Sequence, residues 1–216
     1  MASNIESTTA RLKAEGIVAI VRGDYGEHEI LQMGEALLEG GITLIEVTLN
    51  TRGALESIPM LRNRFGDTMM VGAGTVRTME QVKIALDAGA EFLVSPNFDP
   101  ASVARALAHD MLHLPGVATP TEAQNAFNAG CRMLKLFPVD VLGGAAYLKA
   151  VRAPLNDIDF VPTGGIGIEN IAEYARAGAV GVGLGSSLVS KDWTADLLVQ
   201  RGRALRAAWD SAKDAR

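Results

Sequence analysis

Short apolar runs alternate with longer amphipathic stretches along the whole chain of 216 residues. Eight of these runs are mostly rich in β-branched or large apolar residues, which is typical of parallel strands buried on both faces. They are residues 17–22, 43–49, 69–74, 91–96, 111–115, 133–138, 159–163 and 180–184. Helices are predicted between them, and a further helix near 4–15 precedes the first strand.

Four of the predicted helices end alike, each with glycine shortly before the next strand. The four sequences are E-G-G-I (39–42), D-A-G-A (87–90), N-A-G-C (128–131) and R-A-G-A (176–179). Glycine accepts the left-handed conformation that ends a helix. This recurring unit predicts repeated βα modules within one domain that spans residues 1–216, with no linker.

Eight strands with helical crossovers fit a closed (β/α)8 TIM barrel, and the length lies near the lower end of that fold's range. The competing architecture is an open doubly wound sheet. No G-x-G-x-x-G follows the first strand, where a dinucleotide-binding sheet would need it. The sequence therefore predicts an α/β protein, a (β/α)8 TIM barrel with an extra N-terminal helix.

Composition limits the partners of the chain. The formal net charge is −5, which argues against a broad basic face for nucleic acid. The single cysteine excludes an intrachain disulfide and fits a reducing compartment. No run of about 18 apolar residues could span a membrane, and the first residues lack the apolar stretch of a secretory signal. We expect a cytoplasmic protein with no membrane partner.

Two opposite charges lie in predicted buried strands. In 133–138, Lys135 shares a face with Met133 and Phe137, while leucines take the other face. In 43–49, Glu46 likewise lies on the face that is predicted to point inward. Lys135 and Glu46 are therefore predicted to point into the barrel as natural partners. A structural ion pair is one interpretation, although buried pairs often add no net stability.

The second interpretation is chemical. Burial disfavours the ammonium form and lowers the pKa of lysine. The amine can then attack a ketone to form an imine, which draws electrons from the adjacent carbon–carbon bond. Such a reaction needs a group that moves protons, and Glu46 is the candidate.

Glycine-rich segments end the last two predicted strands. T-G-G-I (163–166) stands just before a predicted helix, and G-L-G-S-S (183–187) follows strand eight. In TIM barrels a phosphate often binds at the loops after strands seven and eight, where backbone N–H groups and a helix N-terminus face the anion. Tight turns are the alternative. Ser186 could donate its hydroxyl or serve as an N-cap.

Other candidates are more ambiguous. G-A-G-T-V (72–76) could be only a tight turn, with Thr75 facing the mouth of the barrel. Arg22 ends strand one and could hold a carboxylate or phosphate, or be solvated. His113 has inward parity and is predicted to be a hydrogen-bonded core histidine. No cluster has metal-ligand spacing, so neither a metal nor a cofactor is expected.

The motifs taken together resemble a known family. They are I-V-A-I-V-R-G, I-E-V-T-L-N, V-G-A-G-T-V, S-P-N, P-G-V-A-T-P-T-E-A, L-K-L-F-P, P-T-G-G-I and G-L-G-S-S-L, in family order from about 17 to 189. The chain resembles the class I, pyruvate-dependent 2-keto-3-deoxy-6-phosphogluconate and 6-phosphogalactonate aldolases, a family that includes 4-hydroxy-2-oxoglutarate aldolases. The resemblance implies a homotrimer of barrels, with Lys135 as the Schiff-base residue and Glu46 as the acid/base.

The resemblance also implies a set of substrate-binding residues. Arg22 matches a contact to the substrate's carboxylate end, and Phe137 matches the aromatic residue beside the lysine. Thr75 and Pro96 match positions that line the pyruvate pocket. The phosphate site is matched by Thr163, Gly164, Gly165, Gly185 and Ser186.

One position departs from the pattern. Typical phosphogluconate aldolases carry arginine four residues after the glutamate, and Asn50 stands there instead, with Arg52 two residues further on. Asparagine at this position looks more like the phosphogalactonate branch, so the epimer preference leans that way and dual specificity is plausible. The implied reaction releases pyruvate and D-glyceraldehyde 3-phosphate from the phosphorylated keto-acid. The alternatives are 4-hydroxy-2-oxoglutarate cleavage, a phosphosugar epimerase or isomerase, and a non-enzymatic ligand-sensing barrel.

Overall fold

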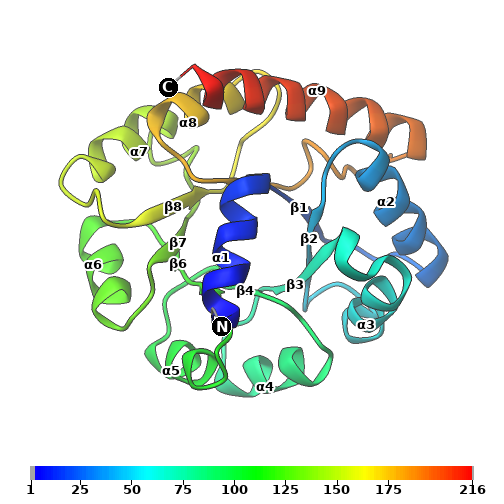
Figure 1. The fold of residues 1–216 in the computed structure, drawn as a ribbon, viewed down its shortest axis with the longest axis horizontal. Helices are drawn as coiled ribbons and strands as arrows, with labels where there is room; N and C mark the ends of the chain where they lie inside the picture. The colour runs from blue at the N-terminus through cyan, green and yellow to red at the C-terminus, as the bar shows by residue number, and fades with distance from the viewer. Residues whose placement is uncertain (1–2, 216) are drawn as a thin grey trace.

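The computed structural model describes residues 3–215, which form an α/β fold in which parallel strands line the interior and helices surround them (Figure 1). The helices are α1 (Asn4–Glu15), α2 (Glu27–Glu39), α3 (Ala54–Phe65), α4 (Met79–Asp87), α5 (Pro100–Ala108), α6 (Pro120–Asn128), α7 (Gly144–Arg152), α8 (Ile171–Ala177) and α9 (Ala195–Asp214), with a 3-10 turn at Gly66–Thr68. The strands are β1 (Ile17–Val21), β2 (Leu44–Thr48), β3 (Met70–Gly74), β4 (Leu93–Val94), β5 (His113–Leu114), β6 (Gly116–Val117), β7 (Met133–Leu136), β8 (Asp159–Pro162) and β9 (Val182–Leu184).

The strands pair in two parallel groups. Six lie in the order β5-β4-β3-β2-β1-β9, and three lie in the order β6-β7-β8. The predicted strand at 111–115 is corrected to two short strands, β5 and β6, separated by Pro115. β5 pairs with β4 and β6 pairs with β7. Proline has no N–H to donate to a ladder, and its carbonyl accepts the Lys135 N–H. A parallel bridge between Thr163 and Gly183 links the end of β8 to β9.

The predicted glycine ends are confirmed. Gly41, Gly89, Gly130 and Gly178 all have φ between 78° and 103°. Only glycine adopts this left-handed conformation without a steric cost. Each therefore reverses the chain from a helix into the following loop, which keeps the βα repeat short.

Side chains alternate between an inner cluster and the layer under the helices, as strand geometry requires. The inner cluster consists of Leu12, Val18, Leu44, Met70, Phe92, Val94, Leu112, Leu114, Met133 and Val161. Since Leu112 and Leu114 both belong to it, His113 points outward, and the predicted inward parity of His113 is wrong. Both faces of this strand carry apolar residues, so the sequence alone could not show which face points inward.

Helix α1 covers the end where the strands begin and lies across the centre of Figure 1. A capping box formed by Ser3 and Glu6 starts it, and Gly16 ends it at φ 75°. Leu12 joins the inner cluster, and Lys13 pairs with Asp159 at the start of β8, with 2.5 Å between nitrogen and oxygen. Because α1 closes the end where the strands begin, the site must lie at their carboxyl ends.

No helix within residues 3–215 is long and apolar enough to cross a membrane.

Candidate active site

Lys135 is the buried cation of the inner face. Its side chain projects inward from β7, is only 4% exposed, and places Nζ 4.9 Å from the centroid of the Phe137 ring. Burial is the largest influence and lowers the pKa of Lys135; Glu46 opposes this shift, and Arg22 adds to it. None of the ion pairs found among the described residues includes Lys135. At a given pH, a larger fraction of this amine is therefore neutral and nucleophilic than for an exposed lysine.

Glu46 is the buried acid of the same face. It projects inward from β2 and is 2% exposed. Its Oε1 atom has no hydrogen-bond partner in the described chain. Burial raises the pKa of Glu46, against the opposing influence of Lys135 and Arg22. The ion pair that the sequence suggested is therefore not formed at bonding distance, although the two groups are close enough to influence each other.

Gly74 explains how Glu46 fits. A Cβ at Gly74 would lie 1.8 Å from Glu46 Oε1, so the carboxylate occupies the space that any other residue would fill. Gly72, which is paired with Glu46 across the sheet, similarly makes room for the Phe92 ring. The G-A-G segment is thus more than a tight turn, because its second glycine forms one wall around Glu46.

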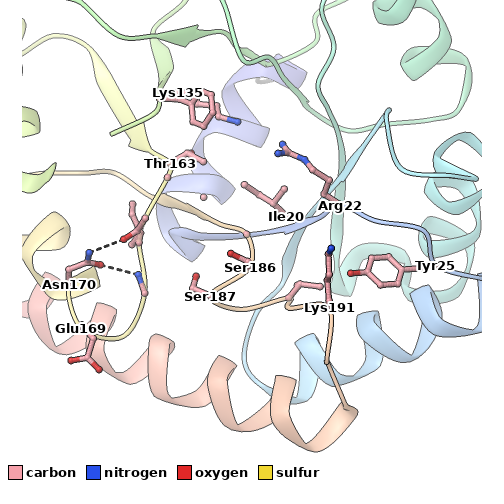
Figure 2. Close-up of a pocket in the computed structure, with 18 residues that line it drawn as sticks. Ile20, Arg22, Tyr25, Lys135, Thr163, Glu169, Asn170, Ser186, Ser187 and Lys191 are labelled. Atoms are coloured by element: carbon pink, nitrogen blue, oxygen red, sulfur yellow. Dashed lines mark hydrogen bonds between the residues drawn. The ribbon is translucent and has the colours of Figure 1, made fainter. Parts of the chain in front are cut away.

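Two cavities meet at Lys135. The larger has a volume of about 640 Å³, within the usual range of ligand pockets, and opens at the carboxyl ends of the strands (Figure 2). The smaller, of about 10 Å³, is lined by Glu46. Both are lined by Lys135, Thr163 and Gly183. The small cavity approaches the volume that one water needs, about 10–15 Å³. Lys135 therefore stands between the open pocket and a small, mostly apolar cavity that Glu46 also lines.

Most predicted binding residues reach the large cavity. Its walls include Arg22, Phe137, Thr163, Gly164, Gly165, Gly185 and Ser186. In Figure 2 the guanidinium of Arg22 is directed toward Lys135. The remaining three predicted residues line neither cavity: Asn50 is exposed in the turn after β2, while Thr75 and Pro96 are half-buried beside the strand ends.

The glycine loop after β8 is shaped by Asn170, which the sequence reasoning missed. Gly164 and Gly165 have φ of 108° and 62°. The Gly167 N–H donates to Asn170 Oδ1 (3.0 Å), and Asn170 Nδ2 donates to the Gly165 carbonyl (2.9 Å). The helix expected after T-G-G-I is α8, which begins at Ile171 after a short turn. The only sequence signal for Asn170 was its place before a helix, where asparagine is common.

Other missed residues lie at the mouth of the pocket. Tyr25, Glu169, Ser187 and Lys191 all line it, from the loops after β1, β8 and β9. Figure 2 shows the amine of Lys191 directed toward Arg22 beside Tyr25, whereas the carboxylate of Glu169 points away. Their loops have no regular period, so no pattern in the sequence could have placed them.

A buried network supports the end of β3 from the side of the strands that the helices cover. Ser95 Oγ donates to the Val76 carbonyl and contacts His113 Nε2, each at 2.5 Å. Burial lowers the pKa of His113 to about 4, so its ring is neutral near pH 7. Thr75 lies between Gly74 and Val76 with φ 58°, a costly conformation for a β-branched residue. Neighbouring hydrogen bonds hold this segment in place.

Other reactive groups contribute little. Burial raises the pKa of Cys131 to about 12, which makes it a poor nucleophile near neutral pH. Within residues 3–215, no group of three or more His, Cys, Asp or Glu side chains is arranged to hold a metal ion.

The geometry agrees with comparisons to known proteins. The family model described as KDPG and KHG aldolase matches residues 8–202. The chain belongs to this aldolase family. It is 43% identical to the 2-dehydro-3-deoxy-phosphogluconate aldolase of Treponema pallidum, over 68% of the chain and 69% of that protein. It is 35% identical to the 2-dehydro-3-deoxy-6-phosphogalactonate aldolase of Escherichia coli K12, over 91% of the chain and 95% of that protein.

A solved family member addresses the chemistry directly. The chain matches KDPG aldolase from Legionella pneumophila, whose crystal structure has pyruvate captured at low pH as a covalent carbinolamine intermediate. The TM-score is 0.79 at 30% identity, and the match covers 93% of this chain and 96% of that one. The family resemblance in the sequence is thereby confirmed, and the two curated relatives differ in which phosphorylated sugar acid they are named for.

Proposed function

We propose that the protein is a class I aldolase that cleaves a 2-keto-3-deoxy-6-phospho-sugar acid to pyruvate and D-glyceraldehyde 3-phosphate. The observation that carries this proposal is a buried lysine without a carboxylate partner in the described chain, placed at the base of a cavity of about 640 Å³. The membership of the chain in the aldolase family supports the same activity.

The first step is imine formation. The neutral amine of Lys135 attacks the C2 ketone of the substrate, and the resulting carbinolamine loses water. Because burial lowers the pKa of Lys135, the neutral form is available nearer to neutral pH than it would be for an exposed lysine. The protonated imine then accepts the electron pair of the C3–C4 bond.

Glu46 moves the protons. Its raised pKa suits a group that must both accept and donate a proton near neutral pH. Glu46 and Lys135 both line the small cavity. Glu46, through a water, takes the proton of the C4 hydroxyl as C3–C4 breaks and glyceraldehyde 3-phosphate leaves. It then returns a proton to C3 of the enamine, and hydrolysis of the imine releases pyruvate.

The two ends of the substrate are held apart by different groups. Arg22, directed toward Lys135, binds the carboxylate end. The phosphate binds at the glycine loops, where Gly164, Gly165 and Gly185 line the cavity together with Ser186 and where TIM barrels often bind phosphate. Binding energy at the phosphate then orients the reacting carbons. Thr75, Pro96 and Asn50 remain substrate-binding candidates by their motifs alone.

The complete architecture is also inferred. We take the two sheets as parts of one closed eight-stranded TIM barrel, with β5 and β6 as one strand interrupted at Pro115 and the Thr163–Gly183 bridge as the join between β8 and β9. Helix α1 is the extra N-terminal helix at its base. A cytoplasmic homotrimer follows from the resemblance, and sedimentation should give the mass of three 22.8 kDa chains.

The competing functions are less well supported. A phosphosugar epimerase has no need of a neutral lysine beside an acid, and the close relatives are named as aldolases. The preference between the two sugar acids stays a prediction. Asn50 favours phosphogalactonate, while the chain matches relatives named for phosphogluconate and for phosphogalactonate.

Borohydride reduction in the presence of pyruvate tests the proposal. The mass of the protein should rise by one reduced adduct, on the peptide that contains Lys135, and Lys135→Arg should lose both adduct and pyruvate release. Pyruvate release, coupled to lactate dehydrogenase, should be measured on both phosphorylated epimers. Turnover without an adduct would refute the imine mechanism.

A further inference from the structure

Lys191 is a cation at the pocket mouth whose role the proposed mechanism leaves open. It follows β9 and lines the large cavity together with Ser186 and Ser187. It takes part in none of the ion pairs found among residues 3–215. An exposed lysine whose amine faces a ligand cavity is thus available to an anion that enters it.

The charges around the cavity favour an anion at this end. Lys191 and Arg22 are the exposed cations among the lining residues, and Glu169 is the one carboxylate among them, directed away from the cavity in Figure 2. Arg22 is oriented toward Lys135, at the inner end. The mouth is therefore locally positive in a chain whose net charge is −5, and Lys191 contributes that charge to the same cavity that the two serines line.

The backbone before Lys191 is anchored. Arg201 on α9 donates to the Leu188 carbonyl (3.3 Å) and to Ser190 Oγ (2.9 Å). The N–H groups of Leu188 and Val189 donate to the Gly185 carbonyl. These bonds fix the backbone from which the Lys191 side chain extends. Binding an anion therefore costs only the entropy of ordering that one flexible side chain.

We infer that Lys191 recognises the phosphate of the substrate and makes the enzyme selective for phosphorylated over non-phosphorylated keto-acids. This inference rests on the proposed function. The glycine loops and serine hydroxyls offer neutral donors that a water or a hydroxyl group could also satisfy. A lysine ammonium is a point charge that binds a phosphate dianion far better than a neutral hydroxyl, so it separates the two substrate classes.

Substitution at Lys191 tests the inference with a matched control. Lys191→Gln should lower kcat/KM for the 6-phosphorylated substrate about tenfold, the scale of one charge-assisted hydrogen bond at a partly exposed site. It should leave kcat/KM for the non-phosphorylated acid within about twofold, the scatter expected of a surface change. Lys191→Arg should restore most of the loss. Lys149→Gln, an exposed lysine on α7 away from the cavity, should change neither.

A second readout does not depend on turnover. Inorganic phosphate, titrated calorimetrically, should bind Lys191→Gln about tenfold more weakly than wild type, and the difference should shrink as salt is added. Equal losses on both substrates, or unchanged phosphate binding, would overturn the inference. If the proposed function itself were wrong, wild type would release no pyruvate and form no borohydride adduct, and the phosphate titration would still decide the role of Lys191.

Discussion

Replacing Gly74 by alanine tests whether close packing behind Glu46 matters for catalysis. The new Cβ would lie 1.8 Å from Glu46 Oε1, whereas real Cβ contacts essentially never fall below 3.0 Å. The carboxylate must therefore move by more than about 1 Å, and a misplacement of about 1 Å can cost roughly 100-fold in rate. Overpacking should also cost about 1–3 kcal/mol, which lowers Tm by about 2–12 °C at this chain length.

The assay separates the two halves of the reaction. Gly74→Ala should reduce kcat about 100-fold and should still form the borohydride adduct with pyruvate, because Lys135 is untouched. Adding Glu46→Asp, which draws the carboxylate back by about one bond of 1.5 Å, should recover part of the lost stability. Gly26→Ala is the control, since its nearest new contact is an ordinary 3.5 Å. Full kcat in a folded Gly74→Ala protein would refute the reasoning.

Two further predictions concern the residues that hold the site in place. Asn170→Ala removes both bonds that shape the Gly165–Gly167 loop, so KM for the phosphorylated substrate should rise about tenfold, the scale of two lost hydrogen bonds; an unchanged KM would exclude a role for the loop. His113 has a pKa of about 4 in the folded protein and an ordinary pKa of 6.5. Between pH 4 and pH 6.5, its ring is therefore protonated in the unfolded chain but not in the folded one. The contribution of neutral His113 to the free energy of unfolding is fully present above pH 6.5. It is lost as the pH falls toward 4, by up to about 3 kcal/mol. Urea unfolding should show that the fall in stability from pH 7 to pH 5 is smaller in His113→Gln, and an identical fall in both proteins would contradict this.

The sequence predicted the inner site wherever strand parity was unambiguous. The alternation of side chains along each strand placed Lys135 and Glu46 on the inner side, where both line the small cavity. For His113 the same argument failed, because Leu112 and Leu114 would have suited either face. The sequence also could not predict that Lys135 and Glu46 form no direct ion pair, since the distance between β7 and β2 depends on how the strands are arranged in space and not on local pattern.

The glycines also show which features a sequence pattern can predict and which depend on tertiary structure. Sequence identified their positions and, for the helix ends, their conformation. It could not reveal that Gly74 faces Glu46, because that contact joins neighbouring strands whose register is a tertiary property. Lys191 and Asn170 were missed because irregular loops carry them, and loop geometry follows from anchors such as Arg201 that are distant in sequence.

Keeping Lys135 and Glu46 apart has a chemical consequence. A direct salt bridge would stabilise the ammonium and raise the pKa of the lysine, leaving little neutral amine to attack a ketone. At a distance, Glu46 still raises the pKa of Lys135, but Arg22 lowers it, so the two neighbours act in opposite directions and burial decides the outcome. Each group influences the pKa of the other, and both line the same small cavity. The unsatisfied Glu46 oxygen costs stability, and under the proposed mechanism an acid already bonded elsewhere could not exchange protons with the substrate.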